Sequence, residues 1–87
     1  MKIISSKEFE KTLDKIPLNS ANKIRNKINN LATSKENLDI KKLKNRNDYR
    51  LRIGDYRVTF EYSSVENKVV IILHAVSHRK DVYKKRK

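Results

Sequence analysis

The chain contains no cysteine and no tryptophan, and it has one glycine and one proline in 87 residues. Without cysteine there are no disulfides, no thiolate metal ligands and no cysteine nucleophile. A single glycine excludes glycine-rich phosphate loops and the dinucleotide-binding fingerprint, which both need several glycines. The two histidines lack the spacing of a metal site. We therefore predict a domain that uses neither a bound metal nor an organic cofactor.

Long apolar segments are also absent. The longest run, Val69 to Leu73, is far shorter than the roughly 20 residues of a membrane-spanning helix. Residues Met1 to Ile4 lead directly into charged residues, which is unlike a signal peptide. A chain of 87 residues is below the usual size of two domains. We expect one cytoplasmic domain over residues 1–87.

Positive charge is what the chain has in excess. The formal net charge is +12 at pH 7. Residues 1–40 carry 8 Lys and Arg against 5 Asp and Glu, whereas residues 41–87 carry 14 against 5. Such a small, basic protein usually meets a polyanion, with nucleic acid the first candidate and an anionic membrane surface the second. A lysine-rich composition alone would not explain why the excess lies in the second half.

The first third of the chain predicts a short strand and two helices. Lys2 to Ile4 suit a strand, and Ser5 with Glu8 suits a capping box at the start of a helix near residues 6–15. A second helix can begin at Pro17 because proline is tolerated in a first helical turn. Its apolar stripe consists of Leu18, Ala21, Ile24, Ile28 and Leu31.

From Tyr49 onward the apolar period changes from helical to two. Tyr49 to Ile53 and Tyr56 to Tyr62 alternate apolar and polar residues on either side of Gly54-Asp55, which predicts a β-hairpin. After a turn within Ser63 to Asn67, the segment Lys68 to Val76 is almost continuously apolar, as in a central or covered strand.

The predicted order is strand, helix, helix, strand, strand, strand, with residues 33–40 as a polar connection. One helical layer on one sheet is the simplest packing. We therefore predict an α+β fold in which a helical hairpin packs on a small, mainly antiparallel sheet. The other face of the sheet would then be available for binding.

Strand alternation places three arginines on one face of the hairpin. Side chains at i and i+2 share a face, so Arg50 and Arg52 project together, and Arg57 joins them from the paired strand. Three guanidinium groups repel one another, and their planar forks suit phosphate. The alternative is a solvated sheet face with Glu61 as a partial partner.

The segment after the last strand offers an imidazole, two cations and a phenol, which are His78, Arg79, Lys80 and Tyr83. Histidine suits proton transfer near neutral pH, and tyrosine can stack on a base or move a proton. A basic surface tail is the simpler explanation of the same residues. His74 lies inside the apolar strand, where we expect a hydrogen-bonded structural histidine.

These groups suit one reaction in particular, which is cleavage of RNA through its 2′-hydroxyl. Cations would stabilise the extra negative charge on phosphorus, and a proton carrier would assist attack or departure. The reaction needs no metal. No paired-carboxylate or Ser-His-Asp arrangement stands out in the sequence.

Two segments resemble a known family. The stretch Tyr49 to Val58 resembles the hairpin signature of the RelE/ParE toxin superfamily, and His78 to Tyr83 resembles its C-terminal motif. Leu43-Lys44 lies where family members often carry a leucine and a basic residue. The resemblance covers nearly the whole chain and implies the same helical hairpin on a mainly antiparallel sheet.

The resemblance also implies an activity. RelE-type members cleave mRNA in the ribosomal A site, arrest translation and are held inactive by a RelB-like antitoxin. By position, Arg57 and Arg79 match arginines that stabilise the scissile phosphate, and Tyr83 matches a tyrosine that orients substrate or assists proton transfer. RNA contacts are expected from Arg50, Arg52, Lys44 and Lys80.

One departure from the family concerns the general base. Arg50 and Arg52 stand where RelE has lysines, and arginine effectively cannot lose its proton. His78 could take the proton instead. Two other functions stay open: a ParE-like, non-enzymatic poison of DNA gyrase, and an inactive relative that only binds RNA.

Overall fold

The computed structural model describes residues 2–33, 38–43 and 48–80. These residues contain two helices and five strands. Their bounds are β1 (Lys2–Ser5), α1 (Lys7–Asp14), α2 (Leu18–Thr33), β2 (Asp39–Lys42), β3 (Tyr49–Ile53), β4 (Tyr56–Val65) and β5 (Lys68–His78). The predicted α+β class is confirmed. The prediction of four strands was wrong, because β2 was taken for part of the connection.

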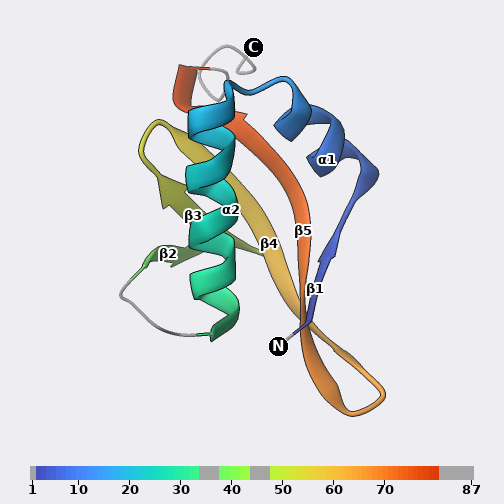
Figure 1. Cartoon of the computed structure of the whole chain (residues 1–87). Coiled ribbons are helices and arrows are strands. Elements are labelled where there is room, and N and C mark those ends of the chain that lie inside the picture. The colour runs from blue at the N-terminus through green and yellow to red at the C-terminus, as the bar shows by residue number, and fades with distance from the viewer. Residues whose placement is uncertain (1, 34–37, 44–47, 81–87) are drawn as a thin grey trace, which may run out of the picture.

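The strands form one mixed sheet in the order β1-β5-β4-β3-β2. β1 is parallel to β5, and the other neighbours are antiparallel. Both helices lie on one side of this sheet (Figure 1), and their apolar residues share a single core with β3, β4 and β5. The opposite side of the sheet therefore has no helical cover among the described residues.

The start of α1 lies one residue later than the sequence predicts. Ser5 stays in β1, paired with Leu73, so Ser6 is the N-cap, and its hydroxyl accepts the Phe9 N–H at 3.0 Å. The predicted capping box of Ser5 and Glu8 is therefore wrong. The Ser6 hydroxyl also donates to the carbonyl of His74 at 2.8 Å, which ties the helix start to β5.

The second helix begins directly after Pro17, whose carbonyl accepts the Ala21 N–H at 2.9 Å. Four residues of the predicted stripe are buried, namely Ala21, Ile24, Ile28 and Leu31. Leu18 is 74% exposed, because at 3.6 residues per turn it lies about 100° around the helix from the centre of that stripe. No helix among the described residues is long and apolar enough to cross a membrane.

Both predicted hairpins form, and the turn of the second hairpin is shorter than the sequence predicts. Gly54 adopts φ +56 in the β3–β4 turn, a conformation that glycine tolerates well. In the second hairpin β4 runs on to Val65, and only Glu66 and Asn67 turn, both with positive φ. β5 continues to His78, so Ser77 and His78 belong to the strand and not to a tail.

Candidate active site

The side of the sheet away from the helices carries the predicted arginines. Arg52 lies directly opposite Arg57 across β3 and β4, and Arg50 lies opposite Thr59. Their neighbours Leu51 and Val58 are fully buried under the helices. The structure thus confirms that Arg50, Arg52 and Arg57 share the open face, and we call these three residues the arginine row.

One carboxylate faces two of these arginines. Asp39 of β2 lies opposite Arg52 and accepts its Nε–H at 2.6 Å, while Arg50 Nη2 lies 3.5 Å from the other carboxylate oxygen. The sequence suggested Glu61 as a partner of these arginines, but Glu61 contacts His74 instead. The sequence could not reveal Asp39, because β2 is a four-residue edge strand without apolar alternation.

The arginine row retains donors that no described residue satisfies. Arg50 Nε and Arg57 Nη1 are buried and have no hydrogen-bond partner among the described residues. A buried donor without a partner is unfavourable by about 1–3 kcal/mol. An anion with several acceptor oxygens would satisfy such groups, and phosphate matches the guanidinium fork.

His78 does not join the arginine row. Ser77 pairs with Arg57 and His78 pairs with Tyr56, so His78 projects toward the opposite, helical side of the sheet. Its ring lies against Tyr56 with centroids 5.1 Å apart and planes at 90°. The Nδ1 atom of His78 accepts the backbone N–H of Lys80 at 3.1 Å.

Arg79 lies at the end of the β3–β4 hairpin. Its backbone N–H donates to the Asp55 carbonyl at 2.7 Å, and its Nη1 lies 3.6 Å from the Asp55 carboxylate. Arg79 therefore reaches the turn that precedes Arg57 in the chain. Lys80 is exposed beside it. Lys44 and Tyr83 lie outside the described residues.

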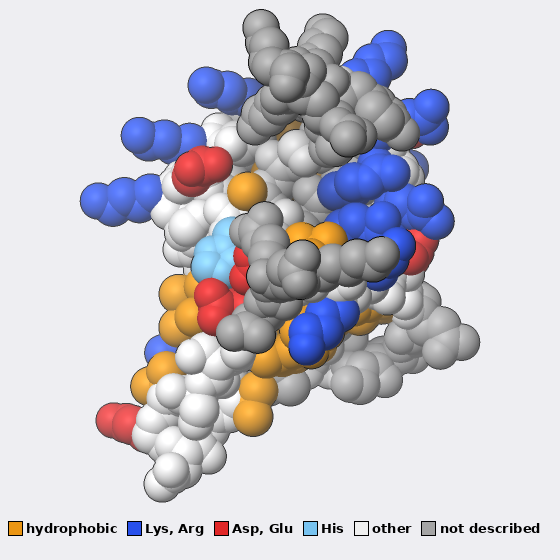
Figure 2. Space-filling view, turned by 180° about the vertical axis from the view of Figure 1, so that it is seen from behind, with side chains coloured by type: hydrophobic (Ala, Val, Ile, Leu, Met, Phe, Trp, Pro, Cys, Tyr) orange, Lys and Arg blue, Asp and Glu red, His pale blue; other side chains and the backbone are white. Residues whose placement is uncertain are grey.

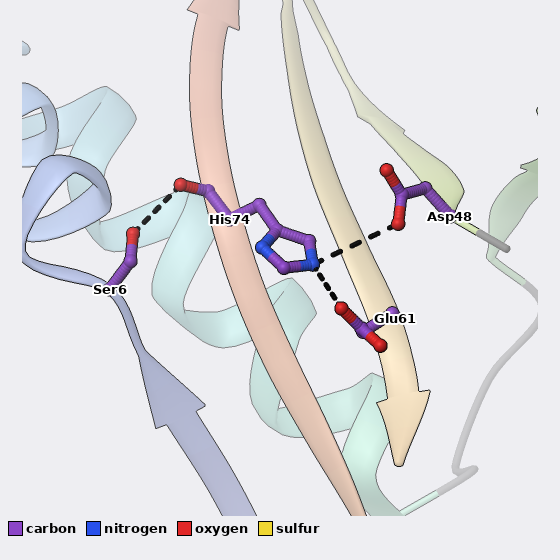
Figure 3. Close-up of polar contacts among 4 residues, drawn as sticks. All are labelled: Ser6, Asp48, Glu61 and His74. Atoms are coloured by element: carbon purple, nitrogen blue, oxygen red, sulfur yellow. Dashed lines mark hydrogen bonds and ion pairs between the residues drawn. The ribbon is translucent and has the colours of Figure 1, made fainter. Parts of the chain in front are cut away.

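A second group on the open face was missed by sequence reasoning. His74 Nε2 lies 2.6 Å from Glu61 Oε1 and 3.8 Å from Asp48 Oδ1 (Figure 3). We call Asp48, Glu61 and His74 the acid–imidazole cluster. The three donor atoms all lie within 4.8 Å of one another, so the group could also hold a cation. The prediction that His74 is hydrogen-bonded is confirmed.

A register shift in the sheet accounts for the position of this cluster. Thr59 pairs with Ala75 and Phe60 pairs with Leu73, so His74 is the extra residue of β5 at a β-bulge. Bulges re-aim side chains and are frequent beside active sites. Glu61 follows Arg57 and Thr59 at even spacing, which was the one signal in the sequence that placed it on the open face.

The cluster and the arginine row are neighbours on that face. Asp48 precedes Arg50 by two residues and Glu61 follows Thr59 by two, and Arg50 and Thr59 are paired. Two residues along a strand span about 6.6 Å, which is within the reach of an arginine side chain. Figure 2 views the molecule from this side and shows cationic side chains on the same surface as a histidine and acidic groups.

The pKa of one tyrosine in the sheet is raised above its ordinary value. Burial raises the pKa of Tyr62, and the neighbouring phenol of Tyr49 raises that pKa further. The two rings are 5.3 Å apart at the centroids, and both lie close to Phe60 on the helical side. Tyr62 therefore lies away from the arginine row.

Comparison with known proteins identifies the class to which this fold belongs. The family model of the ParE toxin of type II toxin–antitoxin systems, parDE, matches residues 3–83. The chain belongs to the RelE/ParE superfamily of toxins.

Several relatives with substantial sequence identity are RelE toxins. Toxin RelE3 of Methanocaldococcus jannaschii is 36% identical, over 95% of this chain and 96% of the relative. The crystal structure of the RelB–RelE antitoxin–toxin complex from Methanococcus jannaschii superposes with a TM-score of 0.75 at 32% identity, over 97% of this chain and 99% of that one. The archaeal RelE–RelB complex from Pyrococcus horikoshii OT3 gives 0.69 at 26% identity, over 90% and 93%.

Proposed function

We propose that this protein is a toxin that cleaves mRNA in the ribosomal A site and so inhibits translation. The observation that carries the proposal is the arginine row with its two partnerless guanidinium N–H groups on an open sheet face. The likeness to RelE toxins across nearly the whole chain supports it. A ribosomal target implies that the protein works in the cytoplasm.

In the proposed reaction the RNA 2′-hydroxyl attacks the adjacent phosphate without a metal ion. Arg57 and Arg50 bind the scissile phosphate and stabilise the negative charge that accumulates on it. Arg79 adds positive charge from the hairpin end, and Arg52, shared with Asp39, holds the flanking backbone. Tyr83 orients the substrate, as the resemblance of the C-terminal motif implies.

The proposed partner in the resting state is a RelB-like antitoxin. The solved relatives from Methanococcus jannaschii and Pyrococcus horikoshii are complexes with RelB. A free protein with a net charge of +12 would bind nucleic acid indiscriminately. An acidic antitoxin segment that orders on the basic surface would prevent this.

A gyrase poison is the second candidate, because the matching family model is that of ParE. Such a toxin binds without chemistry, so it has no need of partnerless arginine donors on an open face. An inactive relative that only binds RNA is the third. It would show strongly salt-dependent affinity and no cut product.

The test is cleavage of a defined mRNA with and without programmed ribosomes. We expect a cut that depends on the ribosome, and we expect Arg57→Ala to slow it about 10²–10³-fold, as for loss of one charge-stabilising donor. Arg25→Ala is the matched control, since Arg25 lies on α2, away from the open face, and its guanidinium pairs with the exposed side chain of Glu10. No cut by folded wild-type protein would refute the proposal, and inhibition of gyrase would then support the ParE-like function.

A further inference from the structure

The proposed cleavage needs a group that removes the proton of the 2′-hydroxyl, and the arginine row cannot supply it. Arginine keeps its proton at any physiological pH. The chain has two histidines, and His78 projects to the helical side of the sheet. His74 is therefore the histidine that shares the open face with the arginines.

We propose that His74, held by Glu61, is the general base of this toxin. The inference rests on the proposed function and names the proton acceptor of that same site. Glu61 Oε1 lies 2.6 Å from His74 Nε2, and a carboxylate at this distance favours the tautomer with the proton on Nε2. Nδ1 is then left with a free lone pair, which is the atom that accepts a proton.

The surroundings of the ring agree with this role. His74 Nδ1 makes no hydrogen bond to a described residue, and the side chain is 38% exposed. Figure 3 shows Nδ1 on the side of the ring away from both carboxylates. A carboxylate that orients an imidazole from behind, with the other ring nitrogen presented to the substrate, is the arrangement that histidine bases use in hydrolytic enzymes.

The position of His74 suits a phosphate held by the arginine row. His74 is the bulge residue between the Thr59–Ala75 pair and the Phe60–Leu73 pair, and Arg50 lies opposite Thr59. His74 thus lies two strands across the sheet from Arg50, an offset of about 10 Å between the backbones, and its ring reaches from β5 toward β4 through the Glu61 contact. A nucleotide on the open face can contact the guanidinium with its phosphate and the imidazole with its ribose.

The chemical step balances without a further reagent. Nδ1 takes the proton of the 2′-hydroxyl while O2′ forms a bond to phosphorus. The bond from phosphorus to O5′ breaks, and water donates a proton to the departing O5′. The products are a 2′,3′-cyclic phosphate and a 5′-hydroxyl, and the imidazolium returns its proton to solvent.

Two other roles of the cluster are distinguishable from this one. In a purely structural role, the Glu61–His74 contact would hold β4 to β5 and nothing more. In a metal role, Asp48, Glu61 and His74 would be the ligands of a divalent cation. The structural role predicts that added imidazole restores nothing, and the metal role predicts that activity depends on a chelatable ion.

The decisive measurement is the single-turnover cleavage rate on programmed ribosomes for wild type, His74→Ala and His74→Gln. We expect both variants to be slowed about 100-fold, the lower range for loss of a general base, and we expect added imidazole to restore part of the rate to His74→Ala. Ser63→Ala, a polar-to-apolar change on β4 at the same face of the sheet, is the matched control and should cleave at the wild-type rate.

The outcomes distinguish the general base from the cleavage activity itself and from a structural or metal-binding role of His74. Cleavage by wild type and equally by folded His74→Ala would overturn the base and leave the proposed function standing, whereas no cleavage by wild type would overturn the function itself. Loss in His74→Ala and His74→Gln without rescue by imidazole would assign a structural role. Toxin that is chelated before the assay, loses activity and regains it with Zn²⁺ would assign the metal role and overturn the base.

Discussion

At the scale of single residues, the charge of the open face depends on how the arginine row shares the carboxylate of Asp39. Arg52 and Arg57 lie directly opposite each other, and like charges in that position repel. Asp39 relieves the repulsion, because its carboxylate contacts both Arg52 and Arg50. The remaining positive charge is then concentrated at Arg57 and the partnerless Arg50 Nε.

Asp39→Asn should tighten RNA binding by freeing two guanidinium groups for phosphate. Each phosphate contact made by one more cation steepens the salt dependence of binding to a single strand by about 0.7 in log–log slope. Fluorescence anisotropy with a short single-stranded RNA over a salt series measures both affinity and slope. Glu10→Gln is the matched control, since Glu10 contacts Arg25 on the helical side. An unchanged slope in Asp39→Asn would show that the freed arginines do not reach RNA.

The residues of the arginine row could be predicted from the sequence, whereas the meeting of the three residues of the acid–imidazole cluster could not. Alternation alone put Arg50, Arg52 and Arg57 on one face, since they lie in two strands joined by a tight turn. His74 and Glu61 belong to strands whose register shifts by a bulge, and no local pattern encodes that shift. The role of His78 stays a prediction, and its place on the helical side of the sheet separates it from the row.

At the scale of secondary structure, Ser6 joins two elements. Its hydroxyl caps α1 through the Phe9 N–H and donates to the His74 carbonyl of β5. Ser6→Ala removes both contacts and should lower the free energy of unfolding by about 1–2 kcal/mol, the range for loss of an N-cap. Urea denaturation followed by circular dichroism measures this difference.

The neighbouring serine provides the control for that prediction. Ser5 is exposed in β1 and makes no cap, so Ser5→Ala should change stability by less than about 0.5 kcal/mol, as for most surface substitutions. Equal effects of the two substitutions would show that the cap is not fixed at Ser6.

The helices and strands differ in how well they can be predicted from the sequence. Apolar alternation predicted β3 and β4, and helical spacing predicted the buried face of α2, because both patterns come from burial on one side. The exposed strand β2 has no buried side to leave such a pattern. Its pairing with β3 comes from backbone hydrogen bonds and from Asp39 opposite Arg52. The N-cap was misplaced by one residue because two adjacent serines are equivalent in sequence and differ only in the register of β1.

At the scale of the whole molecule, the net charge of +12 and the arginine row make separate contributions to nucleic-acid binding. Net charge attracts any polyanion from a distance, whereas the row provides contacts on one face. Two triple variants separate these contributions. The first replaces Arg50, Arg52 and Arg57 by Gln, and the second replaces Lys7, Lys11 and Lys23 by Gln on the helices, where all three are exposed.

Both triple variants have a net charge of +9, so any difference between them reflects where the charge lies. We expect the arginine variant to reduce the slope of log affinity against log salt by about 2, since three contacts at 0.7 each are lost. The lysine variant should lose less than half of that. Anisotropy titrations over the same salt series provide the measurement, with thermal unfolding to confirm that both variants are folded. Equal losses would mean that net charge alone governs binding, and the open face would then have no special part in holding RNA.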